Sequence, residues 1–548
     1  MKIHLIIFIS ILSLVKAEAL FAQKWAVYFT DKNNSAYSID DPEKFLSERA
    51  IERRNKYNIE ITEADIPVNE LYIEQLRQLG ATALGTSRWF NFTLVSCDKD
   101  VKGLIEKLTF VDRIVYVCPE IPIESTHSSD YTFEKWNSAI LKSSWNVENG
   151  FTTANYGSAG LQISQLNGIP LHNRGLTGSG VLICIIDGGF NNADKSGAFQ
   201  HIRERNGIVF ERDIINPGGD VYQEHFHGAY VMSCMGGKID GSFLGTAPDA
   251  NYALLRTESD DFEYLIEEYA LVIGFEVADS IGADIINVSI GYSRFDDSSM
   301  DHDYAKNMDG RTTVSSLAAY MAVQRGIFIC AAAGNTKFSS WPWIDTPADV
   351  PEVMTVGAIG LTGDIAFFSS IGPNAAGFPK PDIVALGGGA FAVGTKNKPE
   401  LVLGTSFSSP IVCGLVACLI QAYPQIPPVE LKDMIIKTGN RYRAHSNEYG
   451  YGIPDFDKVY TGYTGIPQIK QLSDTRVYPN PVMNNLHIET KETMLKIIVY
   501  DISGRVYEQI NCNSNSTIIN MNSYNKGIWF LNIELSSGAK EMVKVVKR

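Results

Sequence analysis

The chain has 548 residues, which is too long for one ordinary hydrophobic core and predicts roughly two to four domains. Hydrophobic residues make up 45% and charged residues 20% of the chain, a balance that is typical of globular proteins and excludes a disordered or collagen-like chain. The formal net charge of -15 at pH 7 disfavours nucleic acids and anionic membranes as partners, because both reward basic surfaces.

The first residues have the pattern of a secretory signal peptide. Basic residues precede an apolar run, Leu5–Val15, which is too short to span a bilayer as a helix. Cleavage after Ala19 or Ala22 fits the small residues that follow, and we favour Ala22 because strand-like sequence begins almost at once. Residues 1–22 are therefore expected to be removed. Since no other segment has about 18 uninterrupted apolar residues, we expect a soluble mature protein without a membrane span.

Residues 23–120 predict a small α+β domain. The strand-like WAVYF is followed by two helical stretches, Pro42–Lys56 and Val68–Leu79, and by strands near Asn91–Cys97 and Arg113–Cys118. The cysteines that end these two strands leave a disulfide open as an alternative. Those within apolar runs are expected to be buried free thiols, and no CxxC pair or Cys/His zinc spacing is present, so no metal ligands are predicted.

The rest of the chain changes its pattern twice. Residues 121–155 are rich in Ser, Thr and Asn and predict an accessible linker. Over residues 156–463, near-continuous apolar runs such as VLICIID and GIFICAAAG alternate with helical stretches, which is typical of a three-layer α/β domain with a parallel sheet. After a second linker at 465–474, short alternating runs over 475–548 predict a small antiparallel β-sandwich.

Four polar residues stand where nucleophilic catalysis would need them. Asp187 ends an apolar strand, where parallel sheets collect ligands, and His227 begins a helix-like run whose dipole helps to keep imidazole neutral. Asn335 closes the strand GIFIC and carries an amide suited to a developing oxyanion. Ser406 stands at the head of an apolar helix, beside free backbone N–H groups. Each residue alone is better explained as a cap or turn residue, whereas the order Asp, His, Asn, Ser is specific.

Eight motifs around these residues closely resemble the subtilases, the S8 family of subtilisin-like serine peptidases. They are IIDGGF, HFHGAYVMS, GTAPDA, NVSIGY, AAAGN, FFSSIGP, PKPDIVALG and GTSFSSP. The resemblance covers about residues 156–460 and implies a subtilisin-like fold with Ser406 as nucleophile, His227 as base and then acid, and Asp187 as the residue that orients His227. It also implies an oxyanion hole formed by Asn335 and the Ser406 N–H.

The resemblance extends to the substrate site. Three residues look like the strand that holds an extended peptide by β-augmentation: Ser289, Ile290 and Gly291. Gly334 and the alanines before it are expected to line the pocket for the side chain before the scissile bond. Two positions depart from the family, since Gly188 replaces a usual Ser or Thr and Ala229 a usual Thr. We expect altered local hydrogen bonding there rather than loss of activity.

Both flanks resemble known accessory domains. KWAVYFTDK and FLSERAIERR are similar to the propeptide of bacterial secreted subtilases, which acts as folding helper and inhibitor. The tail, with YPNPVMNNLHI, VYDISGRVYE, GIWFLNI and VKVVKR, resembles the C-terminal sorting domain of type IX secretion substrates. The resemblance implies the type IX secretion machinery as a partner and a secreted or cell-surface location.

The sequence thus predicts a secreted serine endopeptidase that cleaves protein or peptide substrates and requires no cofactor. The acidic run Asp296–Asp309 leaves structural calcium open, although it lacks the glycine and glutamate of an EF-hand loop and is better explained as a solvated loop. Two rival functions remain: a non-catalytic surface adhesin on a subtilase scaffold, and an esterase that uses the same triad. The presence of all four polar residues argues against the adhesin.

Overall fold

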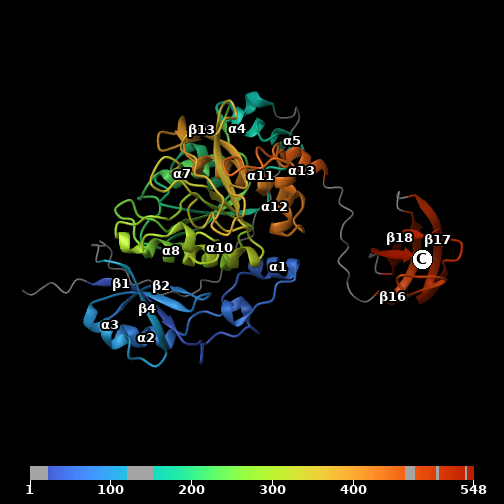
Figure 1. Cartoon of the computed structure of the whole chain (residues 1–548), viewed down its shortest axis with the longest axis horizontal. Coiled ribbons are helices and arrows are strands. Elements are labelled where there is room, and N and C mark those ends of the chain that lie inside the picture. The colour runs from blue at the N-terminus through green and yellow to red at the C-terminus, as the bar shows by residue number, and fades with distance from the viewer. Residues whose placement is uncertain (1–21, 120–151, 463–474, 502–504, 537–539) are drawn as a thin grey trace, which may run out of the picture. The chain divides into compact units, whose positions relative to one another are not determined.

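The computed structural model describes residues 22–119, 152–462, 475–501, 505–536 and 540–548 (Figure 1). The predicted signal peptide up to residue 21, the linker up to residue 151 and the second linker at 465–474 lie outside the described residues. The chain divides into two compact units, Met1–Tyr460 and Thr461–Arg548.

An eight-stranded sheet forms the centre of the larger unit, in the order β14-β13-β12-β11-β10-β5-β9-β6. Its strands are β5 (Leu182–Asp187), β6 (Ile208–Asp213), β9 (Asn251–Arg256), β10 (Ile285–Val288), β11 (Phe328–Ala332), β12 (Met354–Gly360), β13 (Ile383–Val393) and β14 (Pro399–Leu403). Neighbouring strands run parallel except β13 and β14. Every residue of β5, β9, β10 and β11 is buried, as strands covered on both faces require. The predicted α/β class is confirmed.

Two pairs of helices cover the faces of this sheet. Helix α7 (His227–Gly236) packs with α11 (Thr405–Ala422), and α8 (Ile266–Ile281) packs with α10 (Val314–Gln324). Among the described residues, one helix, α11, is long and apolar enough to cross a membrane. However, 89% of it is buried inside the protein. The remaining elements of this region are α4 (Gly160–Ser164), α5 (Ile169–His172), α6 (Gln200–Glu204), β7 (Lys238–Ile239), β8 (Phe243–Leu244), α9 (Tyr304–Asn307), α12 (Pro428–Lys437) and α13 (Phe456–Gly462).

A second, antiparallel sheet with strand order β2-β3-β1-β4 lies in the same unit. It comprises β1 (Gln23–Phe29), β2 (Thr82–Ser87), β3 (Phe92–Cys97) and β4 (Val111–Cys118), with helices α1 (Glu48–Tyr57), α2 (Glu70–Gln78) and α3 (Lys99–Ile105). The helix predicted over Pro42–Lys56 is interrupted, because a 3-10 turn ends at Lys44 and Ser47 caps the start of α1. Strand β2 and helix α3 were not predicted: β2 is broken by a register shift at Gly85, and α3 is short and contains Gly103.

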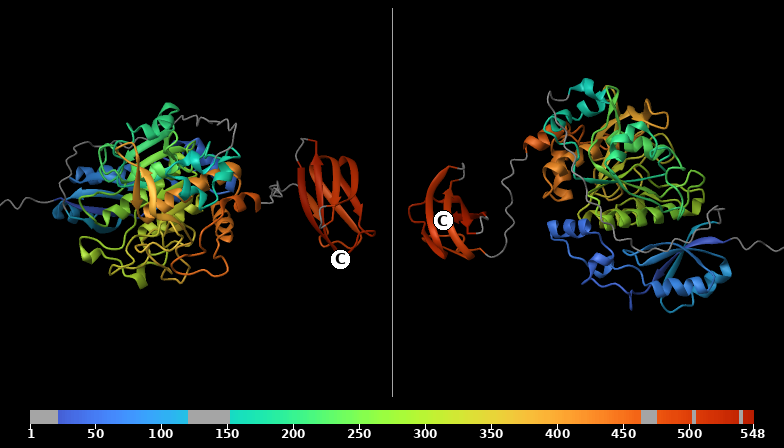
Figure 2. Two further views of the ribbon diagram at one scale, coloured as in Figure 1. Left: turned by 90° about the horizontal axis from the view of Figure 1, so that it is seen from above. Right: turned by 180° about the vertical axis from the view of Figure 1, so that it is seen from behind.

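The two faces of this smaller sheet pack against different partners. Along β1, Val27 and Phe29 join the core beneath α2 and α3, whereas Ala26 and Tyr28 join the core that contains α8. Figures 1 and 2 show the sheet lying across α8 and α10. Cys97 belongs to the first core and Cys118 to the second, and both are free. The disulfide that the sequence left open is therefore absent, because the two side chains leave opposite faces of one sheet.

The unit 461–548 is a five-stranded antiparallel sheet with its own apolar core. Its strands are β15 (Arg476–Tyr478), β16 (Asn485–Tyr500), β17 (Val506–Asn520), β18 (Gly527–Leu535) and β19 (Lys540–Lys547). Alternate residues of β16 are buried at both of its ends, for example Leu486 and Ile488, then Ile497 and Val499. This period of two confirms the antiparallel β fold that was predicted for the tail.

Candidate active site

Asp187 and His227 meet at the carboxyl end of β5. Asp187 is the last residue of that strand and is fully buried, and His227 is the first residue of α7. Nδ1 of His227 lies 2.8 Å from Oδ1 of Asp187. Because a carboxylate only accepts hydrogen bonds, Nδ1 is the protonated nitrogen and Nε2 is the free, basic one.

The environment of His227 favours its charged form, which differs from the neutral imidazole expected from the helix dipole, because nearby carboxylates raise its pKa. Burial lowers the pKa of His227, but the charge of Asp187 and the hydrogen bond to it raise the pKa above its ordinary 6.5. Glu258 and Asp260 raise it further through their charges. The imidazole is therefore a stronger base than a free histidine, and its cation is stabilised once it has taken a proton.

Ser406 lies in the first turn of α11 and is buried. Its hydroxyl donates a 3.1 Å hydrogen bond to the carbonyl oxygen of Ser289, and Ser289 Oγ donates a 3.0 Å bond to the carbonyl oxygen of Ser406. These reciprocal bonds fix the start of α11 against the segment that follows β10. Ser406 and His227 line the same cleft, and the Ser406 hydroxyl is bonded there to Ser289.

Asn335 follows β11 and is anchored at the start of α11. Its Oδ1 accepts hydrogen bonds from the Thr405 backbone N–H at 2.8 Å and from Thr405 Oγ1 at 3.0 Å. A backbone N–H can bond only to the oxygen of the amide, so the orientation of the Asn335 side chain is fixed. Nδ2 is then the end of this amide that is left to donate to a ligand.

The expected substrate segments lie beside the same site. Ser289, Ile290 and Gly291 follow β10 directly, and Ser289 and Ile290 line the cleft. Gly334 has a φ of +103°, and a Cβ on it would come within 2.5 Å of Oδ2 of Asp345. Glycine is therefore required at this position both by its backbone conformation and by the space available.

Gly188, which replaces the usual Ser or Thr, directly follows Asp187, and one carboxylate oxygen of Asp187 accepts no hydrogen bond from the described residues. Gly188 donates its backbone N–H to Oδ1 of Asp187 at 2.9 Å but has no hydroxyl to offer. Oδ2 of Asp187 is buried and accepts no hydrogen bond from the described part of the chain. Ala229, also buried, likewise brings no hydroxyl to the first turn of α7.

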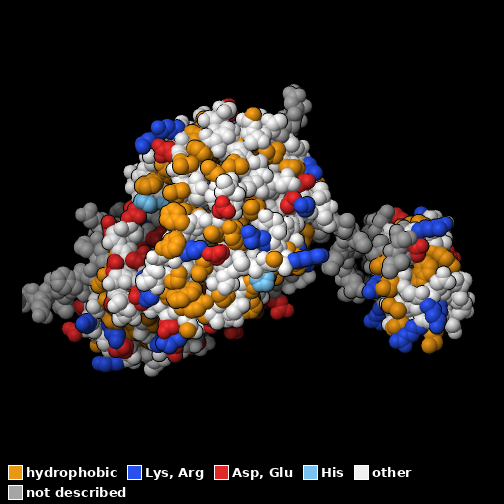
Figure 3. All heavy atoms as spheres, turned by 45° about the horizontal axis from the view of Figure 1, so that its top comes forward, with side chains coloured by type: hydrophobic (Ala, Val, Ile, Leu, Met, Phe, Trp, Pro, Cys, Tyr) orange, Lys and Arg blue, Asp and Glu red, His pale blue; other side chains and the backbone are white. Residues whose placement is uncertain are grey.

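An open cleft of about 510 Å³ is lined by two of the candidate catalytic residues, His227 and Ser406, and its other lining residues are strongly acidic. It is lined by His225, His227, Glu258, Ser259, Asp260, Asp261, Phe262, Glu263, Ser289, Ile290, Asp296 and Ser406. Figure 3 shows acidic side chains and a histidine gathered in a hollow of the larger unit. Burial raises the pKa of Glu258 to about 8 and that of Glu263 to about 7. The sequence analysis did not predict this acidic lining. The run ESDDFE between β9 and α8, which supplies most of its carboxyl groups, could have indicated it.

Two carboxylates of the acidic run considered for calcium already accept hydrogen bonds from nearby residues of the same loop. Asp301 accepts hydrogen bonds from the Phe295 N–H and from Arg294, and Asp303 caps α9. Within the described ranges, no group of three or more His, Cys, Asp or Glu side chains is placed to hold a metal ion.

Comparison with known proteins identifies the family. The model of the subtilase family matches residues 178–452. The chain belongs to the subtilase family. In this subtilase, the model of the Bacteroidota peptidase S8 propeptide domain matches residues 24–132, and that of the secretion system C-terminal sorting domain matches residues 476–548.

Named relatives of this subtilase align with only part of its length. The human membrane-bound transcription factor site-1 protease is 26% identical over 363 residues, which cover 62% of this chain and 31% of that protein. Subtilisin NAT of Bacillus subtilis subsp. natto is 28% identical over 296 residues, which cover 53% of this chain and 68% of the relative. Among solved structures, MycP1 from Mycobacterium smegmatis is 22% identical, with a TM-score of 0.43 over 59% of this chain and 88% of the other.

Proposed function

We propose that this subtilase is a secreted serine endopeptidase that hydrolyses peptide bonds in protein or peptide substrates. The observation that carries the proposal is the 2.8 Å contact between Nδ1 of His227 and Oδ1 of Asp187, at the edge of a cleft that also contains Ser406. A nucleophile, a base and a group that orients the base are then within reach of one substrate atom. Family membership supports the same chemistry.

The proposed reaction proceeds through an acyl-enzyme. Oγ of Ser406 attacks the scissile carbonyl carbon while Nε2 of His227 takes the hydroxyl proton. The carbonyl oxygen becomes an oxyanion that receives hydrogen bonds from Nδ2 of Asn335 and from the Ser406 N–H. His227 then gives its proton to the leaving amine as the C–N bond breaks. Water repeats the sequence on the ester, which frees the acid and restores Ser406.

Asp187 acts in this scheme through His227 alone. Its charge and hydrogen bond stabilise the imidazolium that forms when Ser406 loses its proton. Every proton in the scheme moves between side chains, substrate and water, so the reaction requires no cofactor. Ser289, Ile290 and Gly291 are proposed to bind the peptide as an added strand, with Gly334 beside the side chain that precedes the scissile bond.

We further propose the following organisation for the chain: a signal peptide at 1–22, a propeptide at 23–120, a linker at 121–155, a catalytic domain at 156–463 and a secretion sorting domain at 475–548. The propeptide and sorting-domain matches support this division. They also support export by the type IX secretion machinery to the medium or the cell surface. Cleavage within the linker would free the catalytic domain from the propeptide.

The function is tested by digesting a denatured protein mixture with the purified enzyme and sequencing the new termini. A serine-directed fluorophosphonate should label the wild type and fail to label a Ser406→Ala variant, which should also produce no new termini. Hydrolysis of simple esters without peptide cleavage would support the esterase instead. The absence of both labelling and hydrolysis in the processed enzyme would favour the adhesin.

A further inference from the structure

A buried carboxyl group lies against both glycines of the expected substrate site. A Cβ on Gly334 would come within 2.5 Å of Oδ2 of Asp345, and a Cβ on Gly291 would come within 2.9 Å of Cβ of Asp345. Tyr292 and Thr346 exchange two backbone hydrogen bonds, of 3.0 and 3.2 Å. Because each of these two follows Gly291 or Asp345 directly in the chain, the bridge fixes Asp345 beside the substrate segment.

Asp345 is a buried carboxyl group without an ion-pair partner among the described residues, although Ser293, Trp341 and His302 are near enough to lower its pKa. Its exposed fraction is 7%, and its Oδ1 is buried without a hydrogen bond from any described residue. No lysine, arginine or histidine in the described ranges forms an ion pair with it. Leaving such a group unpaired costs free energy, which a native site tolerates where a ligand completes the pair.

The carboxyl is ionised at neutral pH despite its burial. Burial raises its pKa to about 6, while the polar groups of Ser293 and Trp341 oppose the rise. His302 is the basic residue whose charge lowers the pKa of Asp345, but its ring is hydrogen-bonded to Glu268 instead. A negative charge without a cation therefore remains at this point of the site.

The surroundings add to the negative potential. Asp349 raises the pKa of Asp345 through its charge, and Asp345 does the same to Glu263 in the acidic cleft. Asp260, Asp261 and Asp296 line that cleft as well. A wall of one sign of charge draws ligands of the opposite sign and excludes acidic ones.

We propose that Asp345 determines the specificity of this subtilase, by binding the lysine or arginine side chain that precedes the scissile bond. The inference deepens the proposed peptidase function and rests on it. The ammonium or guanidinium group of the substrate would supply the missing donors to Oδ1 and neutralise the buried charge. Gly291 and Gly334 carry no side chains that would stand between the substrate and Asp345. Asp345 is thus a binding residue that leaves the chemistry of Ser406 unchanged.

The test compares peptides that differ only in the residue before the cleaved bond: lysine, arginine, glutamine or leucine. The wild type should cleave the lysine and arginine peptides with the highest kcat/KM. Asp345→Asn keeps the size of the side chain and removes its charge, so kcat/KM should fall by at least about 30-fold for the two basic peptides. The readout is the ratio of kcat/KM for the basic peptides to kcat/KM for the leucine peptide, which should fall in this variant.

Three further measurements keep the test decisive. Asp240→Asn removes the same charge from a side chain that is 93% exposed, and it should leave the ranking of the four peptides unchanged. Asp345→Glu keeps the charge and should keep the preference for basic residues. The termini produced by the wild type in a denatured protein mixture should follow lysine or arginine, and this readout needs no variant.

The two proposals fail in different ways. A wild type that cleaves the leucine and lysine peptides equally, with the same ratio in Asp345→Asn, overturns the role of Asp345 and leaves the peptidase standing. A wild type that cleaves none of the peptides and is not labelled by fluorophosphonate overturns the peptidase itself. If Asp345→Asn does not fold, the termini and Asp345→Glu decide, and termini without basic residues count against the proposal.

Discussion

The Thr405 backbone N–H donates a 2.8 Å hydrogen bond to Oδ1 of Asn335, a residue 70 positions earlier in the chain. The bond ties the loop after β11 to the start of α11, immediately before the candidate nucleophile Ser406. It also leaves Nδ2 as the end of the Asn335 amide that is available to a ligand, because Oδ1 is already occupied. The hydroxyl of Thr405 adds a second bond, of 3.0 Å, to the same oxygen.

Asn335→Ala should lower kcat by about 100- to 1,000-fold with little change in KM. Nδ2 is proposed to donate only to the oxyanion, so its loss raises the energy of the transition state and not that of bound substrate. Steady-state kinetics on one peptide would measure both constants. Thr405→Val, which removes the hydroxyl bonded to Asn335, should lower kcat by a smaller factor. Thr405→Ser keeps a hydroxyl and should keep kcat near the wild-type value. An effect mainly on KM would make Asn335 a ground-state contact or a turn residue.

Ser406→Ala and His227→Ala should each remove nearly all turnover and leave the fold intact, because the triad acts as a unit. Asp187→Asn should lower kcat by about 10⁴-fold, since an amide favours the wrong tautomer of His227. Turnover would be followed with a chromogenic peptide, and folding by the melting temperature. A Ser406→Ala enzyme with most of its activity would contradict the assignment.

Activity should decline in acid as His227 gains a proton, since only the neutral ring accepts the proton of Ser406. The net rise in the pKa of His227 places this decline above pH 6.5. Removing the negative charge of Asp260, by substitution with Asn, should lower that pKa and move the acidic limb of kcat/KM to lower pH. Glu258 is left in place, because burial raises its pKa to about 8 and it is mostly uncharged where His227 titrates.

The measurement is kcat/KM against pH for the wild type, Asp260→Asn and Asp240→Asn. Asp240→Asn, which removes an exposed charge, should keep the wild-type profile. An acidic limb at the same pH in all three enzymes would show that Asp260 does not act on His227.

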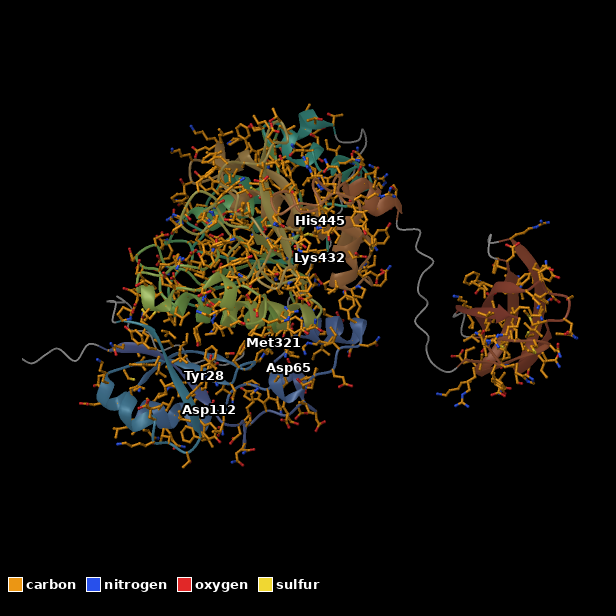
Figure 4. All side chains as sticks on the ribbon, viewed as in Figure 1. Tyr28, Asp65, Asp112, Met321, Lys432 and His445 are labelled. Carbon is orange, nitrogen blue, oxygen red and sulfur yellow. The ribbon has the colours of Figure 1, made fainter. Side chains whose placement is uncertain are left out.

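The contact between the N-terminal sheet and α8 should depend on Asp279. This residue is fully buried and pairs with three guanidinium groups of the N-terminal region, those of Arg53, Arg54 and Arg88. In Figure 4, Tyr28 and Asp65 lie on one side of this contact and Met321 on the other. Asp279→Asn removes the ion-pair partner of the buried Arg53 and Arg88, while Arg54 keeps its pair with Asp65, so the free energy of unfolding should fall by about 3–5 kcal/mol.

Urea unfolding of the uncleaved precursor would measure this loss, with Ser406→Ala in the background to prevent self-cleavage. The matched control is Asp41→Asn, which breaks the exposed pair with Lys44 and should leave the free energy of unfolding nearly unchanged. Burial raises the pKa of Asp279, but the arginines lower it more, to below its ordinary 3.8. The stabilisation is therefore present above about pH 4 and is lost as pH falls through the lowered pKa. Equal losses for both variants would mean that the buried network does not hold the contact.

Truncation after residue 463 should give an active protease that accumulates in the periplasm. The unit 461–548 has its own core, which includes Leu486, Ile497 and Trp529, so its removal exposes little of the catalytic interior. Activity in periplasmic and medium fractions would be compared with the full-length chain. Normal appearance of the truncated protein in the medium would contradict the sorting role, and an insoluble product would contradict the boundary.

The sequence by itself determined the fold class and the candidates for catalysis. Buried strands such as β5 and β11 are apolar throughout, so their pattern survives in the sequence without any contact information. The order of Asp187, His227, Asn335 and Ser406 pointed to one reaction before any distance was known, and their roles stay predictions. The run 82–87 was not recognised as a strand, because its pairing with β3 and the shift at Gly85 are not encoded locally.

Only the tertiary structure decided what surrounds these residues. Cys97 and Cys118 end β3 and β4, the two strands on either side of β1. Their side chains leave opposite faces of the sheet, because the register of each strand is set by its pairing with β1. Asp345 has no neighbour in sequence that marks it as a substrate contact. It meets Gly291 and Gly334 through backbone pairing between distant loops, and its missing partner becomes visible only when every nearby atom is in place. Local patterns specify elements, whereas charge, burial and unmet hydrogen bonds are properties of the packed site.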